Sequence, residues 1–394
     1  MKKKFLPLWL LFILMWFLLF IQSGNAQSRG KEITQKSKLI PLSGSYEKTG
    51  GSPVSVQTGC IIFCEPAESL KMTVTTDEFM PPEVDLDGSK MSDSGRIYHV
   101  MKGGSLRWEI SRGWLEKFYS NGIQYKAPLA PGSFKVSALL KEESNYSVME
   151  PEQNALAEHN ILGTFVFNVM VMYPFDREGS GVIEGYPIGI YPNEEAEDVR
   201  EPIASHKQAY KPPRYFIKVT PENAMALVSD HFVLSDFSPL GEKDKEHFIA
   251  LAPSLVQRLE DILSGLKEKG LNLDTLKIIR GYLSPNEVER LRRKNINIAV
   301  FSRSIYGDSA TFIIDKNQDD IMDDLNNDKT LDKKDMDIIE EVVQSVESRT
   351  KLYGGIGIYY HFYDPVHKDT PCVQIDTRGW HSRWGDSPDE GNAP

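Results

Sequence analysis

Cysteine is scarce in this sequence: the 394 residues include three, Cys60, Cys64 and Cys372. In an extended strand, residues four apart are separated by roughly 13 Å, which is too far for a disulfide bond between Cys60 and Cys64. We therefore expect free, buried thiols that pack as small apolar side chains. A Cys60–Cys64 bridge in an oxidising compartment is the alternative.

An excess of basic residues is also missing. Lys and Arg number 45 against 56 Asp and Glu, and the formal net charge is −11. An acidic surface does not favour the phosphate backbone of nucleic acids, so we predict no nucleic acid partner. An anionic polymer of a cell wall would have to bind at a local site instead of through the overall charge.

One long apolar run is present, from Phe5 to Ile21, and it follows three lysines at positions 2–4. The small residues Gly24 and Ala26 then fit the cleavage site of a signal peptide. The pattern predicts an export signal over residues 1–26 and a mature chain that begins at Gln27, in the periplasm or at the cell surface. An uncleaved leader would be a membrane anchor, because the run is close to the minimum length of a membrane span.

The rest of the chain is long enough for two or three folding units. Residues 39–140 contain short strand patterns separated by glycine and proline clusters, which predicts an all-β sandwich. The end of this region, over 106–136, resembles an immunoglobulin-like repeat. We expect a polar linker over 141–160 and a β-rich connecting segment over 161–213.

Residues 214–385 change to a mixed helix and strand pattern. Apolar residues at helical spacing predict a helix that opens at Pro253 and stops at Gly270. Two further helices are expected over 285–294 and 335–348, and strands over 276–279, 310–314, 357–362 and 372–376. We therefore expect an α+β unit with an antiparallel sheet, followed by a disordered tail over 386–394.

Four short motifs in this second unit stand in a fixed order. They are Arg280-Gly281-Tyr282-Leu283-Ser284-Pro285, residues 302–311, residues 354–359 and residues 373–379. In order and spacing they resemble the zinc D-Ala-D-Ala carboxypeptidase family, over residues 162–384. The resemblance implies the fold of a peptidoglycan D,D-peptidase, which is also the hedgehog-like fold. It further implies peptidoglycan or its stem peptide as the ligand.

The resemblance also implies three zinc ligands, and this sequence lacks all of them. Where the family has His, Asp and His, the chain has Ser304, Thr311 and Gln374, and only the last Asp of the fourth motif is kept, as Asp376. Hydroxyls and a carboxamide offer zinc neither an imidazole nor an anionic oxygen, so zinc is not expected here. Water activation by zinc then loses its basis. Leu283 replaces an arginine suited to hold the substrate carboxylate.

Two functions fit this pattern. The first is an exported, non-catalytic envelope protein whose degenerate domain binds or scaffolds peptidoglycan or an envelope partner. The alternative is an active peptidoglycan peptidase whose zinc has moved to other ligands near the old site. The candidates for these ligands are His361, His367, His381, Asp364 and Asp369, although their spacing matches no known ligand pattern. A third hypothesis places the function in the β-sandwich.

An acidic stretch over 315–335 carries a different metal signal. Counted from position 324, oxygen-bearing residues recur at positions 1, 3, 5, 7, 9 and 12 of a calcium loop. They are Asp324, Asn326, Asp328, Thr330, Asp332 and Asp335. The pattern resembles dockerin-type loops, although Lys329 stands where glycine normally makes the sharp turn, and a second frame from Asp315 to Asn326 overlaps. We expect a structural calcium ion, with a solvated acidic loop that caps the helix at Asp335 as the alternative.

Overall fold

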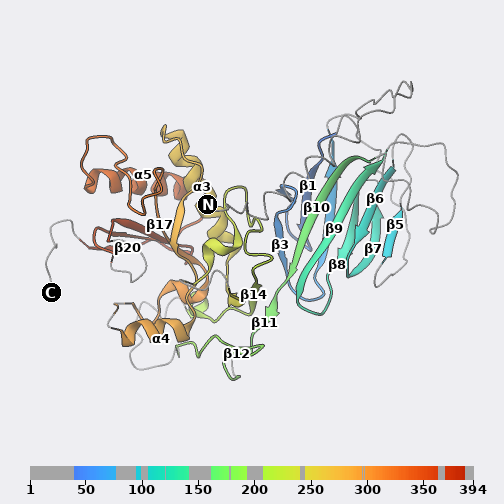
Figure 1. The fold of residues 1–394 in the computed structure, drawn as a ribbon, viewed down its shortest axis with the longest axis horizontal. Helices are drawn as coiled ribbons and strands as arrows, with labels where there is room; N and C mark the ends of the chain where they lie inside the picture. The colour runs from blue at the N-terminus through green and yellow to red at the C-terminus, as the bar shows by residue number, and fades with distance from the viewer. Residues whose placement is uncertain are drawn as a thin grey trace, which may run out of the picture. The chain divides into compact units, whose positions relative to one another are not determined.

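The computed structural model describes residues 40–76, 95–98, 105–119, 121–141, 161–176, 179–192, 207–239, 245–294, 296, 298–362 and 369–386. The chain divides into two compact units, Met1–Lys38 and Leu39–Pro394, and every described residue lies in the second. The predicted leader, the linker beyond residue 141 and the tail beyond residue 386 lie outside the described residues. Over the described ranges the fold is mixed α+β, with mostly antiparallel sheets and few helices (Figure 1).

The first part of the fold is all-β and consists of two five-stranded sheets. One sheet has the order β2 (Val54–Val56), β1 (Ser43–Lys48), β4 (Ser69–Thr75), β8 (Gly122–Lys126) and β7 (Trp114–Tyr119). The other has the order β3 (Ile61–Cys64), β10 (Ile161–Val171), β9 (Gly132–Lys141), β6 (Ser105–Ile110) and β5 (Gly95–Tyr98). The pairs are antiparallel except β3 with β10, which is parallel.

Alternation along the strands builds one core between these two sheets. Leu70 and Met72 of β4 and Ile123 of β8 are fully buried, while Lys71 and Thr73 between them are half-buried. Trp108 and Phe167 of the other sheet join the same apolar cluster and stack with ring centroids 6.1 Å apart. Period-two patterning therefore places the apolar side chains inside, as the sequence predicts.

Strand β10 extends this all-β region beyond the predicted boundary. Residues 161–171 were expected in a connecting segment, but they form the second strand of the sheet, paired with β9 along ten register positions from Ile161 to Val171. Lys141, expected in the linker, ends β9. The burial of this strand alternates from Gly163 to Val169, but no local pattern shows that its partners are β9 and β3, so the segment could not be assigned to this sheet from the sequence. Cys60, Cys64 and Cys372 are free and buried, as expected.

Short elements follow β10. The structure has the small sheet β11 (Tyr173–Pro174), β14 (Tyr215–Val219) and β15 (His247–Ile249), and the hairpin β12 (Val182–Ile183) with β13 (Tyr186–Pro187). The described residues here also form the 3-10 turns η3 (Lys207–Tyr210), η4 (Leu234–Phe237) and η5 (Arg303–Tyr306).

The last sheet has five strands in the order β16 (Lys277–Arg280), β17 (Ser309–Ile313), β19 (Cys372–Asp376), β18 (Gly355–Tyr359) and β20 (Ser382–Gly385). The first four are antiparallel, as expected, whereas β20 runs parallel to β18. Three α-helices accompany the sheet: α3 (Pro253–Glu268), α4 (Pro285–Arg293) and α5 (Lys333–Thr350). The predicted helices and strands of this region are therefore confirmed to within three residues at their ends.

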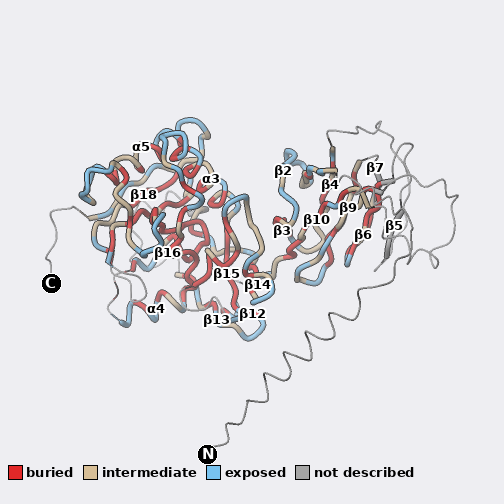
Figure 2. The backbone as a smooth tube through the Cα atoms, turned by 45° about the horizontal axis from the view of Figure 1, so that its top comes forward, coloured by how far each residue is buried: buried red, intermediate tan, exposed pale blue. Residues whose placement is uncertain are grey.

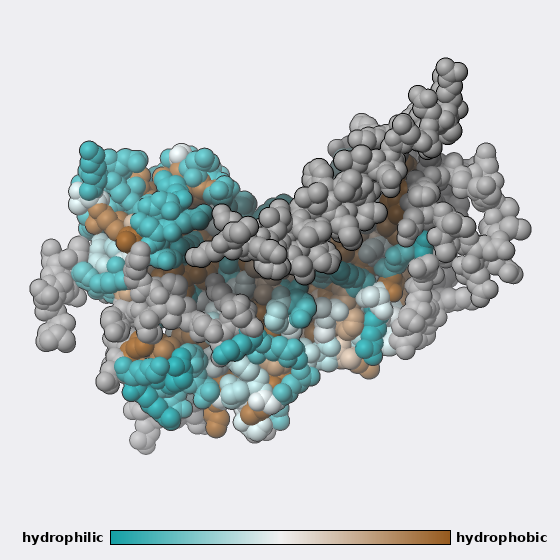
Figure 3. Space-filling view, in the orientation of Figure 1, coloured by the Kyte–Doolittle hydropathy of each residue, from teal (hydrophilic) through white to brown (hydrophobic). Residues whose placement is uncertain are grey.

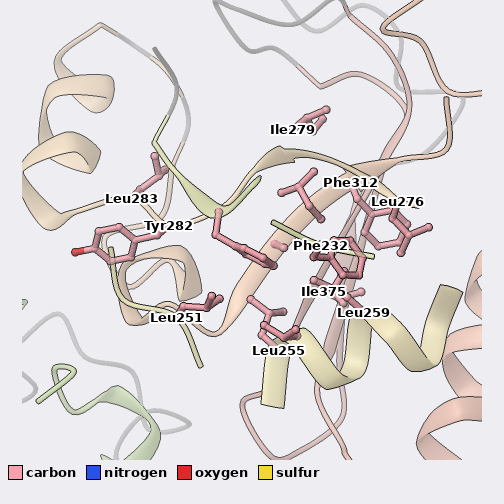
Figure 4. Close-up of a cluster of buried hydrophobic side chains, with 14 of the residues drawn as sticks. Phe232, Leu251, Leu255, Leu259, Leu276, Ile279, Tyr282, Leu283, Phe312 and Ile375 are labelled. Carbon is pink, nitrogen blue, oxygen red and sulfur yellow. The ribbon is translucent and has the colours of Figure 1, made fainter. Parts of the chain in front are cut away.

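Helices α3 and α5 cover the apolar face of this sheet. Helix α3 begins with Pro253 in its first turn, and Gly270, with φ +90°, ends it. Leu255 and Leu259 of α3 lie against Phe312 and Ile375 of the sheet (Figure 4). A methyl group on Gly265 of α3 would lie 2.7 Å from a side-chain atom of α5, so the two helices approach closely there. Buried residues follow the sheet and the inward helix faces (Figure 2).

Candidate functional site

A row of five residues crosses the last sheet at one level. The strand register pairs them successively, one from each strand from β16 to β20: Arg280, Thr311, Gln374, Gly357 and Trp384. We call these five residues the polar row. Directly paired residues share one face of a sheet, so the row lies on the face opposite to Phe312, which packs against α3. Two of the predicted zinc positions, Thr311 and Gln374, are thus direct neighbours.

Ser304, the third position that the resemblance assigns to zinc, lies close to Leu283, which stands where the family has arginine. Ser304 is in turn η5, and the backbone N–H of Leu283 donates a hydrogen bond to the Ser304 carbonyl at 3.2 Å. Gly307 ends the turn with φ +72°, and a methyl group there would lie 2.4 Å from the backbone of Ala250. Only glycine fits this turn, which directs the chain from Ser304 into β17 and the polar row.

The side chains at these positions are neutral and almost all buried. Ser304, Thr311 and Leu283 are each 1% exposed. Gln374, which is half-buried, donates from its amide nitrogen to the hydroxyl of Ser309 at 3.1 Å. A catalytic zinc site needs three imidazole or anionic ligands and an open position for water, and this arrangement of hydroxyls and one carboxamide offers no such ligand.

Asp376 is the one acid among the positions of the degenerate zinc site, and the fold uses both its oxygens. It is fully buried, accepts the backbone N–H of Gly355 at 2.9 Å, and accepts the backbone N–H of Arg378 at 3.0 Å. The Arg378 guanidinium also donates to both carboxylate oxygens, at 2.9 and 2.5 Å. These bonds tie β19 to β18 and to the following turn, which is a structural role.

Trp384 closes one end of the polar row, and the sequence analysis missed it. Methyl groups on Gly355 and Gly357 would lie 2.3 and 2.1 Å from the Trp384 ring, so the indole covers this part of β18. The indole N–H donates to the Tyr359 hydroxyl at 2.9 Å, and Arg378 lies over the ring at 4.8 Å. Two glycines on one face of a strand are a signal for a bulky neighbour.

A buried ion pair anchors turn η5, and it too was missed. The guanidinium of Arg303, 5% exposed, donates to both carboxylate oxygens of Asp308 and to the Ala209 carbonyl at 2.7 Å. It also lies over the rings of Tyr210 and Tyr306, at 4.9 and 4.6 Å. Burial raises the pKa of Asp308, although Arg303 opposes this effect. Arg303 and Asp308 stand on either side of the tight turn at Gly307. Opposite charges that flank a glycine turn are the sequence signal for such an ion pair.

The histidines proposed for a re-sited zinc do not form a cluster in the described residues. His361 lies 3.6 Å from Asp369, and both are exposed, whereas His381 lies 3.2 Å from the buried Glu347. His367 and Asp364 lie outside the described residues. Over the described part of the chain, no three His, Cys, Asp or Glu side chains are grouped to hold a metal ion.

The predicted calcium loop joins β17 to α5, and its polar groups bond to its own backbone. Asp324 accepts the Lys329 N–H at 2.6 Å, and Asp328 accepts the Thr330 N–H at 2.9 Å. Lys329 has φ +70°, so the chain makes the sharp turn at this position without glycine. One oxygen of Asp324, Oδ1, is buried and has no hydrogen-bond partner among the described residues.

The end of this loop caps α5, but not as expected. Asp332 is the N-cap residue and accepts the Lys334 N–H at 2.8 Å, while Asp335 is the third helical residue. Asp335 is fully buried and accepts the N–H groups of Asp332, Leu325 and Asn326 at 2.8, 2.7 and 3.2 Å. The prediction that the helix begins at Asp335 is therefore wrong by two residues, because the capping box places an acid on both sides of the first turn.

Lysines stand beside several of these carboxylates. In the overlapping frame, Lys277 forms ion pairs with Asp315 and with Asp320, the latter at 2.6 Å. In the main frame, Lys334 donates to Asp328 at 2.8 Å, and this bond lowers the pKa of Asp328. The buried Asp315 thus has an ammonium partner, whereas Oδ1 of Asp324 has none.

Comparison of the chain with protein families, with curated proteins and with solved structures gives no match in any of the three. No helix within the described ranges is long and apolar enough to cross a membrane.

Proposed function

We propose that this chain is an exported cell-envelope protein whose last domain is a degenerate relative of the zinc D-Ala-D-Ala carboxypeptidases. It keeps a D,D-peptidase-like fold without the peptidase chemistry, behind an immunoglobulin-like all-β region. Its role is to bind peptidoglycan, or to scaffold an envelope partner.

One observation carries the proposal: two of the three positions that the resemblance assigns to zinc, Thr311 and Gln374, are direct neighbours, yet they hold neutral side chains. Thr311 and Gln374 are paired across two strands, and Ser304 leads into the same strand as Thr311. A chance resemblance of separate motifs would not be expected to bring these positions together. The side chains that replace the ligands supply no anion and no imidazole, which supports a non-catalytic role.

Peptidoglycan binding is tested by co-sedimentation of the chain with purified, insoluble peptidoglycan. We expect saturable binding, weakened by Gln374→Ala, because Gln374 is a half-buried member of the polar row and occupies one of the positions that the resemblance assigns to zinc. Lys135→Ala, at an exposed position on β9, is the matched control and should bind like the parent chain. No binding to peptidoglycan would leave only the scaffolding role.

Metal analysis of the purified chain separates this proposal from the active peptidase. We expect zinc well below one ion per chain. Stoichiometric zinc, retained after dialysis, would overturn the non-catalytic role and favour ligands such as His361 and His381.

We also propose that the loop from Asp324 to Asp335 binds a structural calcium ion. The supporting observation is the buried Oδ1 oxygen of Asp324, because a buried anionic oxygen without a partner is costly. The carboxylates of Asp324, Asp328, Asp332 and Asp335 are not grouped around one point in the described structure, so calcium would have to draw them together with the amide oxygen of Asn326 and the carbonyl of Thr330. Calorimetric titration tests this: heat of binding at millimolar calcium supports the site, and its absence favours an acidic loop without metal.

A further inference from the structure

Helix α4 is a local exception to the acidic character of the chain. Between Pro285 and Lys294 the four cations Arg290, Arg292, Arg293 and Lys294 face only two acids, so the formal charge of this segment is 4 − 2 = +2, against −11 for the whole chain. Pro285, Val288 and Leu291 bury one side of the helix, and the four cations are all exposed. The surface over α4 is hydrophilic in the space-filling view (Figure 3).

The cations of α4 are available to an outside partner. Arg290 and Arg293 pair with Glu287 and Glu289 in the same helix, but their side chains are 51% and 75% exposed. Exposed pairs of this kind contribute little and exchange readily for other anions. Arg292 and Lys294 form no ion pair with another described residue. Cations at a helix C-terminus also favour the helix itself, but that does not explain the apolar residues beside α4.

Two exposed apolar side chains belong to a loop that is hydrogen-bonded to the first turn of α4. Ile190 is 82% exposed and Val182 is 44% exposed. They belong to one loop, because the N–H groups of Ile188 and Gly189 both donate to the Gly181 carbonyl at 2.9 Å. The loop is attached to α4 by a hydrogen bond from the Asn286 N–H to the Ile188 carbonyl at 3.0 Å. Helix α4 and strand β12 lie along the same lower edge of the fold in both backbone views (Figures 1 and 2).

We infer that this surface, formed by Val182, Ile190, Arg290, Arg292, Arg293 and Lys294, docks on a membrane that contains anionic lipids. Cations reach the lipid phosphates, while apolar side chains enter the boundary between headgroups and acyl chains. A soluble polyanion would use the cations but leave Ile190 and Val182 in water. The acidic remainder of the chain is repelled by the same membrane, so it fixes which side faces the lipid.

Co-sedimentation with lipid vesicles tests the inference. The chain without residues 1–26 is used, because the apolar run of the leader would itself enter a bilayer, and residues from Leu39 onward form a separate compact unit. We expect binding to vesicles with one third phosphatidylglycerol, and little binding to pure phosphatidylcholine. The double substitution Arg290→Glu with Arg293→Glu should lower the partition coefficient at least about tenfold. Ile190→Ser with Val182→Ser should lower it several-fold, most clearly at high salt, where the electrostatic attraction is screened.

Matched controls keep the result interpretable. Lys269→Glu with Arg349→Glu reverses two charges that are also about half exposed in surface ion pairs, and Leu129→Ser removes an apolar side chain that is 68% exposed. Both controls should bind like the parent chain, and circular dichroism shows whether each variant is folded. Equal binding by the α4 variant and its control would overturn the inference. So would retention on soluble polyphosphate without binding to anionic vesicles, which would identify a polyanion as the partner.

Discussion

The two faces of the last sheet are formed by alternate residues of the same strands. They differ in the interactions that fix their side chains. Phe312 and Ile375 face α3 and are buried by an apolar core, whereas Thr311 and Gln374, one position away, face the other side. On the apolar face, almost any close-packed hydrophobic set would stabilise the fold. On the polar face, Gln374 bonds to Ser309 and Trp384 bonds to Tyr359, so these side chains are determined by individual hydrogen bonds instead of by close packing.

The sharpest test of this difference compares two adjacent positions of β17. Phe312→Ala should lower the free energy of unfolding by about 3–5 kcal/mol, because it opens a cavity in the core. Thr311→Ala, on the polar face, should cost only about 1 kcal/mol. Urea unfolding of both variants, followed by tryptophan fluorescence, gives the two values. Similar losses would show that both faces contribute equally to stability.

Zinc should return to the polar face if its three positions still converge. The triple variant Ser304→His, Thr311→Asp and Gln374→His replaces buried neutral groups with zinc ligands, so without metal it should be less stable than the parent chain. Zinc at a hundredfold excess over the dissociation constant should stabilise it by about 2.7 kcal/mol. Thermal melts with and without zinc measure this.

The double variant that keeps Gln374 is the control for the zinc experiment, and its response to zinc should be much weaker. A folded triple variant that binds no zinc would contradict the convergence of the three positions. Peptidase activity is not expected, because Leu283 leaves the substrate carboxylate without a cation.

Asp376 should behave as a structural residue. Asp376→Asn keeps the shape but removes the charge that Arg378 and the Gly355 N–H need, so it should cost about 2 kcal/mol of stability. Asp369→Asn, at an acid whose side chain is 63% exposed, is the matched control and should cost almost nothing. Chemical denaturation of both variants measures these two losses of stability. A stable Asp376→Asn chain that has lost peptidoglycan binding would instead make Asp376 a binding residue.

The calcium loop should give the smallest effect when calcium is present near its dissociation constant. Calcium equal to its dissociation constant stabilises the folded chain by only about 0.4 kcal/mol, and a hundredfold excess by about 2.7 kcal/mol. Asp324→Ala with Asp328→Ala should abolish this response in thermal melts, while calcium-free stability changes little because like charges are removed. Asp319→Ala with Asp320→Ala alters the overlapping frame and should preserve the response. Loss of the calcium response in both double variants would show that the two overlapping loop frames do not bind calcium independently.

Local sequence patterns predicted the helices and strands of this fold well, but they did not predict the tertiary contacts that surround them. Helix α3 and strand β19 follow from periodicity and from stop signals such as Gly270. Strand β10 was assigned to a connecting segment because its partners are set by strand order, although its own burial alternates from Gly163 to Val169. The pairing of Thr311 with Gln374, 63 positions apart, depends on strand order, which no local pattern contains. The Tyr359 partner of Trp384 is 25 positions away and was missed for the same reason, whereas the Arg303 partner Asp308 is only five positions away and could have been predicted from the turn at Gly307.

The three buried thiols determine how the protein responds to unfolding. Burial raises the pKa of Cys64 to about 12, and the thiolate is the form that reacts, so the folded chain is protected from oxidants. In an oxidising compartment an unfolded chain loses this protection, and Cys60, Cys64 and Cys372 can join in non-native disulfides before refolding. Melting without a reductant is then irreversible, and the lifetime of the protein is governed by its unfolding rate. A reductant changes whether the chain recovers after melting, and leaves the stability of the folded state unchanged.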